Sequence, residues 1–120
     1  MSLSGLREEV ARHGPVAYLL TVGGDGRPHT VQLAVSWSDD DELVLAPGNS
    51  TVANAAARPL VSLLWPPAEA GGYSLIVDGT VSAASAAGGG ANSVSVTPTK
   101  AVLHRPGASG SDCVAVYKRA

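Results

Sequence analysis

Residues 16–37 read VAYLLTVGGDGRPHTVQLAVSW and carry the clearest strand signal in the chain. The first part, residues 16–22, is a short apolar run rich in β-forming residues, which indicates a buried strand. Gly and Asp residues follow at positions 23–26, and their Asp-Gly pair is typical of a hairpin turn. From Thr30 to Trp37 apolar and polar residues alternate, as they do in a strand with one buried face. The segment therefore predicts an antiparallel hairpin.

The rest of the chain repeats this pattern of short apolar runs bounded by turn residues. Further strands are expected at residues 42–46, 60–65, 73–81, 93–103 and 113–117, and helices at residues 3–13 and 50–58. We expect a bulge at Asp78 and Gly79 and a break in the sixth strand at Pro98. Residues 82–92 are small and lack an apolar period, which predicts a flexible loop. The sequence therefore predicts a single domain over residues 1–120, mainly β, folded as a six- to seven-stranded antiparallel barrel with one or two short helices.

Composition argues against several classes of partner. Eight Lys and Arg residues against ten Asp and Glu give a formal net charge of −2, whereas nucleic-acid binding needs a basic face. No apolar run approaches the ~20 residues of a membrane helix, and the N-terminal residues lack the features of a secretory signal. A single cysteine, Cys113, forms no internal disulfide and fits a reduced compartment. We therefore expect a cytoplasmic protein with neither a nucleic-acid nor a membrane partner.

Metal binding is not expected either. The three histidines, His13, His29 and His104, have no metal-ligand spacing. The acidic residues 39–41 lack the spaced ligands of a calcium loop, so they are interpreted as a solvated hairpin turn.

The apolar content predicts association with a second copy of the chain. Hydrophobic residues make up 45% of the sequence and charged residues only 15%, against about 25% charged residues in an average soluble domain. Because nearly all the strands are apolar, several outward sides carry too little charge to be well solvated. We therefore expect a homodimer that buries one wall of the barrel.

The segment with most chemical promise is Asn49–Thr51, which follows Gly48 and precedes an Ala-rich helix. A helix N-terminus offers unpaired N–H groups and a positive dipole end, which suit an anion. The hydroxyls of Ser50 and Thr51 can add bonds to phosphate oxygens. The same residue types are common helix caps, and ordinary capping is the favoured interpretation of this local pattern. Glycine-rich nucleotide motifs, zinc-protease motifs and paired cysteines are absent from the sequence.

Several segments, taken in order, resemble the pyridoxamine 5′-phosphate oxidase-like flavin-binding split barrels. They are residues 17–29, 43–50, 58–64, 78–81 and 97–102. The resemblance runs from residue 4 to residue 119 and rests on the order and spacing of these pieces. It implies a split β-barrel that forms a homodimer, with flavin mononucleotide (FMN) at the dimer interface in the members that bind it. Related branches bind a deazaflavin, haem or other tetrapyrroles.

The resemblance also assigns cofactor-binding residues. They are Val31, Gln32, Leu33, Ser36, Asn49, Ser50, Thr51 and Lys100. The helix start would hold the flavin phosphate, and the backbone of strand 31–33 would contact the ring. Arg27, Arg58 and Lys100 are possible substitute cations, although a solvated turn is the favoured interpretation for Arg27 and a helix end, which favours cations, for Arg58. Oxidase-type members carry basic residues where this chain has Thr51 and Val52, and again where it has Val31 and Ser36. Because each lost charge-assisted phosphate bond costs about 1.5–3 kcal/mol, the resemblance implies a weakened FMN site.

The implied function is an FMN-dependent oxidoreductase acting on a small molecule, in which the flavin carries the hydride chemistry. No side chain stands out as a catalytic acid or base. Two alternatives stay open: a deazaflavin-dependent reductase, and a non-catalytic split barrel that has lost its flavin phosphate contacts and binds another small ligand. Trp37 and Trp65 could stack on a flavin ring, but filling of a Phe-free core or of a dimer interface is the favoured interpretation. A redox role for Cys113 is disfavoured because it begins an apolar strand.

Overall fold

The structure is a computed structural model that describes residues 2–87, 91–107 and 110–120. In chain order its elements are α1 (Leu3–His13), β1 (Val16–Val22), β2 (Pro28–Ala34), β3 (Ser36–Trp37), β4 (Leu43–Leu45), α2 (Asn49–Ala57), β5 (Leu60–Trp65), β6 (Ser74–Ser85), β7 (Ser93–Gly107) and β8 (Gly110–Lys118). The hairpin expected from residues 16–37 is present, because β1 pairs with β2 over its full length, from Val16 opposite Ala34 to Val22 opposite Pro28.

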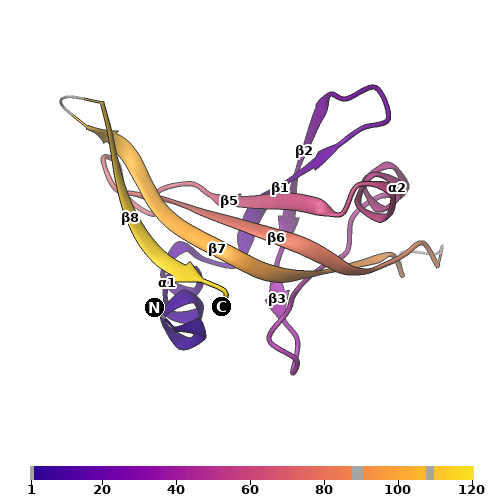
Figure 1. Ribbon diagram of the computed structural model, residues 1–120, viewed down its shortest axis with the longest axis horizontal. Coiled ribbons are helices and arrows are strands. Elements are labelled where there is room, and N and C mark those ends of the chain that lie inside the picture. Colours follow the sequence, from indigo (N-terminus) through magenta and orange to yellow (C-terminus); the bar gives the residue numbers. More distant parts are fainter. Residues whose placement is uncertain (1, 88–90, 108–109) are drawn as a thin grey trace.

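All strands belong to one antiparallel sheet. Its order is β2-β1-β5-β6-β7-β4-β3, and β8 pairs with β7. The order begins with β2 and ends with β3, and only Val35 separates these two strands in the chain. The sheet therefore curls back on itself as a half-barrel, along which β6 and β7 run as long curved strands (Figure 1). The expected mainly β split barrel is confirmed.

The second strand differs from the expected single run over residues 30–37. It divides at Val35, whose N–H donates to the carbonyl oxygen of Pro15 at 2.8 Å instead of to a strand partner. This division raises the number of strands in the described residues to eight, in place of six or seven. Its consequence is that β2 pairs with β1 while β3 pairs with β4 at the other end of the sheet.

The core is built from the inward side chains of the strands. Leu19, Leu63, Leu75 and Val77 are fully buried, as is Trp65, whose indole N–H donates to the carbonyl oxygen of Gly14 at 3.0 Å. The core-filling interpretation of Trp65 is therefore confirmed, since burying a tryptophan requires a partner for its N–H. The two helices cover opposite ends of the sheet (Figure 1).

The long strands β6 and β7 correct two expectations. Residues 82–85 continue β6 and are not loop, and residues 83–85 pair with residues 93–95 of β7. Residues 88–90 of the expected loop lie outside the described part of the chain. β7 also runs unbroken through Pro98, which sits opposite Gly79 where the strand register shifts. The expected bulge at Asp78 and Gly79 is thus confirmed, and it explains how an internal strand accepts a proline.

Candidate functional site

The N-terminus of α2 keeps its backbone donors free of side-chain caps. The N-cap residue is Gly48, in an extended conformation, and the helix has no side-chain cap hydrogen bond within the described residues. The first helical bond runs from the Val52 N–H to the Gly48 carbonyl at 3.1 Å. The capping interpretation of Asn49, Ser50 and Thr51 is therefore wrong. The N–H groups of a first helical turn are suited to an anion, because they point along the positive end of the helix dipole.

A contact between Thr51 and His29 lies on one side of this helix start. Thr51 is only 2% exposed, and its Oγ1 lies 3.3 Å from His29 Nε2. One turn later, the Asn54 side-chain amide donates to Thr21 Oγ1 at 3.3 Å. These contacts fix α2 against β1 and β2. His29 was not among the site residues expected from the sequence. As an alternate residue of β2, it lies on the same strand face as Val31 and Leu33.

A second side chain, Asn92, lies on the other side. Its Nδ2 donates to the Pro47 carbonyl at 3.1 Å and to Asn49 Oδ1 at 2.8 Å. Its Oδ1 is buried and has no hydrogen-bond partner within the described part of the chain. Asn92 also lines a hollow of about 320 Å³ together with Ser36 and Ser93. Sequence reasoning missed Asn92 because it lies at the end of a run of small residues with no motif around it.

The structure brings some of the expected residues together. Asn49, Ser50 and Thr51 form the first turn of α2, whereas Ser36 is exposed on β3 and lines the hollow that Asn92 also lines. Val31 and Leu33 are half-buried against the core on the strand that carries His29, whereas Gln32 between them is exposed.

Lys100 is not joined to this group. It is exposed on β7, where its register neighbours are Asp78 and Lys118, and none of the hydrogen bonds or ion pairs found in the described residues links it to α2. Arg58 at the end of α2 donates to the Val22 carbonyl at 2.6 Å, and Arg27 lies 3.7 Å from Asp25 in the exposed hairpin turn. Lysine and arginine are absent from the helix itself, whose residues read NSTVANAAA.

These donors fit a phosphate by hydrogen bonding more than by charge. The helix start offers backbone N–H groups and the partial positive charge of the helix dipole, and the imidazole of His29 lies 3.3 Å from Thr51 in its first turn. A phosphate ester bound there would have donors for its oxygens, but α2 carries none of the ammonium or guanidinium groups that would make those bonds strongest.

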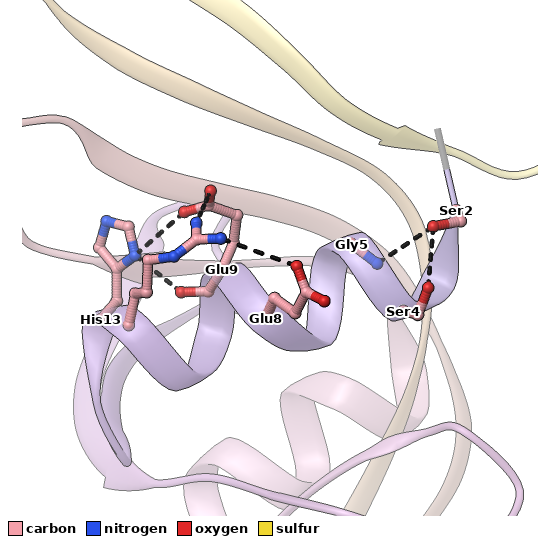
Figure 2. Close-up of polar contacts among 7 residues, drawn as sticks. Ser2, Ser4, Gly5, Glu8, Glu9 and His13 are labelled. Carbon is pink, nitrogen blue, oxygen red and sulfur yellow. Dashed lines mark hydrogen bonds and ion pairs between the residues drawn. The ribbon is translucent and has the colours of Figure 1, made fainter.

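A separate polar cluster joins α1 to the start of β6. His13 lies between two backbone carbonyls, with Nδ1 2.9 Å from Glu9 O and Nε2 3.1 Å from Tyr73 O. Arg12 pairs with Glu9 and lies 3.7 Å from Glu8 (Figure 2). The same figure shows the N-terminal cap, in which Ser2 Oγ accepts from the Gly5 N–H at 3.1 Å. The contact between His13 and Tyr73 holds α1 against the sheet. The charged side chains of Arg12, Glu8 and Glu9 pair with one another.

The cluster continues across β7 and β8. The Tyr73 hydroxyl donates to Asp112 at 2.7 Å, and Arg105 Nε lies 3.0 Å from the same carboxylate and stacks over the Tyr73 ring at 4.4 Å. The hydrogen bond from Tyr73, followed by that from Arg105, lowers the pKa of Asp112, and the same bond to Asp112 raises the pKa of Tyr73. Because Tyr73, Arg105 and Asp112 all contact one another, we interpret the cluster as a structural contact between the start of β6 and strands β7 and β8.

Other expected candidates have different surroundings. Trp37 is half-buried, and the Arg7 guanidinium lies 4.4 Å above its ring. Cys113 is exposed on β8. Within residues 2–87, 91–107 and 110–120, no three His, Cys, Asp or Glu side chains are grouped closely enough to hold a metal ion. None of the helices described is long and apolar enough to cross a membrane.

Comparison with known proteins adds relatives and structural neighbours. No family model matches the chain. Uncharacterized proteins of Mycobacterium bovis and Mycobacterium tuberculosis are each 37% identical to it over 111 residues, which covers 84% of this chain and 78% of each relative.

Three solved structures share the fold. A Clostridium acetobutylicum protein of the pyridoxine phosphate oxidase family, related to general stress protein 26, matches with a TM-score of 0.66, 12% identity and 97% of both chains. A pyridoxamine 5′-phosphate oxidase-related, FMN-binding protein from Nostoc punctiforme matches with a TM-score of 0.60 and 12% identity over 96% of this chain and 92% of that one. A heme-binding protein from Mycobacterium smegmatis matches with a TM-score of 0.64 and 14% identity, over 96% of this chain and 58% of that one.

Proposed function

Because the chain belongs to one family with the two mycobacterial proteins and has the pyridoxamine 5′-phosphate oxidase-like split-barrel fold, we propose that it binds FMN and acts as a flavin-dependent oxidoreductase. The observation that carries the proposal is the uncapped start of α2, flanked by Thr51, His29 and Asn92. It offers a cluster of phosphate donors in a chain whose fold is shared with an FMN-binding protein.

In this proposal the phosphate lies at the N-terminus of α2. Backbone N–H groups of the first turn and the Ser50 hydroxyl donate to its oxygens, and His29 adds a further donor that carries a full charge when it is protonated. Since lysine and arginine are lacking in α2, the affinity for FMN is expected to be moderate, in the micromolar range of about −8 kcal/mol.

The isoalloxazine ring would lie along β2. The backbone of Val31, Gln32 and Leu33 would supply donors and acceptors, because in the described part of the chain β2 is the first strand of the sheet order and pairs with β1 alone. Bound flavin supplies hydride and electron transfer, while the protein binds it, orients it and limits its contact with water.

A second copy of the chain would complete the site by covering the outer side of the sheet. Tyr18, Leu64, Ile76 and Val102 are register neighbours on four adjacent strands and form one apolar row, here called the outer apolar row. All four are half-buried within a single chain. An apolar row that crosses four strands favours protein association, and a two-fold dimer uses the same surface on both copies.

The alternatives predict different behaviour with FMN. A deazaflavin-dependent reductase would use a related ring, and a non-catalytic barrel would bind another small ligand. The shortage of cations around α2 is the observation that favours the non-catalytic alternative. The cytoplasmic location stays a prediction from the sequence.

The test is a titration of the purified protein with FMN, followed by flavin fluorescence and visible absorbance. We expect quenching with a micromolar dissociation constant and a perturbed flavin spectrum, followed by reduction of the bound flavin on addition of a nicotinamide donor. Absence of any change at about 100 μM FMN, more than tenfold above the expected constant, would refute flavin binding. Binding without reduction would instead support the non-catalytic alternative.

A further inference from the structure

We propose that Asn92 is a specificity residue whose Oδ1 accepts a hydrogen bond from a hydroxyl group of the ligand, on the chain that carries the phosphate. The site would therefore take a hydroxylated phosphate monoester, such as the ribityl phosphate part of FMN. This inference rests on the proposed function and adds to it the part of the ligand that Asn92 recognises.

The orphaned acceptor is the first observation. Asn92 Oδ1 is buried and has no hydrogen-bond partner in the described residues, a state that native proteins seldom leave unsatisfied. The orientation of the amide is fixed by its surroundings. The Pro47 carbonyl can only accept, so the nitrogen must face it, and the oxygen must point the other way.

Position is the second observation. The Asn92 amide donates to Asn49, the first residue of α2, and therefore lies beside the N–H groups proposed to hold the phosphate. Asn92 also lines the hollow together with Ser36. A ligand that starts at the helix N-terminus and extends into the hollow would pass beside the Asn92 side chain.

The chemistry then selects the partner. Ionised phosphate oxygens accept hydrogen bonds, so they satisfy the helix N–H groups but offer nothing to a carbonyl oxygen. The orphaned acceptor needs an O–H or N–H donor on the atoms next to the phosphate. Hydroxyl groups on a short carbon chain meet this need, and a flat ring attached directly to phosphate does not.

Three flavins separate the parts of the ligand. FMN has the hydroxylated chain and the phosphate, riboflavin has the chain alone, and lumiflavin has neither. We expect N92L to weaken binding of FMN and riboflavin by a similar factor of about tenfold, and to leave lumiflavin binding unchanged. The matched control is N54L, which removes the amide that donates to Thr21 on the far side of the same helix and should not change the ratio between the three flavins.

The outcomes are distinct. If wild-type protein binds none of the flavins, the proposed function fails and this assignment fails with it. If it binds FMN and riboflavin but N92L binds both as tightly, only the role of Asn92 fails. A loss for FMN without a loss for riboflavin would assign Asn92 to the phosphate and overturn the hydroxyl assignment.

A second measurement needs no variant. The side-chain NH₂ signals of Asn92, followed by nitrogen–proton NMR, should shift with ribose 5-phosphate and much less with inorganic phosphate at the same concentration. Equal shifts with both probes would overturn the inference, because they would show that the amide senses the phosphate alone.

Discussion

His29 and Thr51 connect the second strand to the first turn of α2, and their polar atoms lie beside free backbone donors. If this pair contributes to a phosphate site, its removal should weaken only the ligand that carries a phosphate. We therefore expect H29Q to weaken FMN binding about fivefold to tenfold, with no change for riboflavin. H29R should tighten FMN binding, because it adds a permanent charge. Fluorescence titration of both flavins measures these effects, and an equal loss of riboflavin binding would contradict the assignment.

Glu42 gives a pH-dependent prediction at the same scale. Hydrogen bonds from the hydroxyls of Ser82 and Thr97 lower its pKa below the usual 4.5, and Thr97 Oγ1 lies 2.7 Å from the carboxylate. The pKa of Glu42 is therefore lower in the folded protein than in the unfolded chain. The ionised carboxylate stabilises the fold fully above about pH 4.5, and this stabilisation is lost as the pH falls through the pKa of the folded state.

We expect T97V to lower the free energy of unfolding by about 0.5–1.5 kcal/mol at neutral pH, with the difference shrinking on acidification. Urea unfolding over a pH series measures this. The control is T99V, which removes the 3.1 Å hydrogen bond from the Thr99 hydroxyl to the backbone carbonyl of Asp78. Because a backbone carbonyl carries no charge, the loss of stability in T99V should not vary with pH. A constant cost for T97V would contradict the role of the Glu42 charge.

At the scale of elements, the bulge between β6 and β7 depends on Gly79. A Cβ atom at this position would meet Val96 Cγ1 and would lie 2.8 Å from the Thr97 carbonyl oxygen. The backbone of β7 cannot move away easily, because near Val96 it pairs with β6 on one side and with β4 on the other. We expect G79A to destabilise the protein by about 1–3 kcal/mol, measured by urea unfolding. G24A in the first hairpin has open space around its Cβ and is expected to be neutral, so equal effects would argue against close packing as the cause.

The accuracy of the sequence-based expectations also varies by element. The bounds of β1 and β5 match their expected ranges, because Gly and Pro residues flank apolar runs that have no other interpretation. β6 and β7 run beyond their expected ends. Residues 82–85 are small and carry no apolar period, and their strand conformation comes from pairing with residues distant in the chain.

The candidate site divides in the same way. The start of α2 could be predicted, because the order of Gly48, Asn49 and the Ala-rich run marks a helix start. His29 and Asn92 could not, because their relation to that helix exists only in the folded chain. The prediction for Lys100 depended on its charge alone. Its position opposite Asp78 follows from the pairing of β6 with β7, which only the folded chain shows.

At the scale of the whole molecule, the outer apolar row tests whether a second copy completes the protein. Ile76 is at its centre, between Leu64 and Val102. Its side chain points away from the core, so I76E should leave the single chain folded while it places a charge in the proposed interface. We expect light scattering at micromolar concentration to give a dimer for the wild type and a monomer for I76E, with unchanged far-UV circular dichroism.

The control for this experiment is V114E. Val114 is also apolar and 44% exposed, but it lies on β8 opposite Leu103, on the other face of the sheet from the outer apolar row. V114E should stay dimeric, since only the outer row is proposed to be covered. A wild-type monomer would refute the dimer outright. A monomeric I76E that still binds FMN as tightly as the wild type would show that one chain holds the flavin alone, and the interface would then serve stability and not the site.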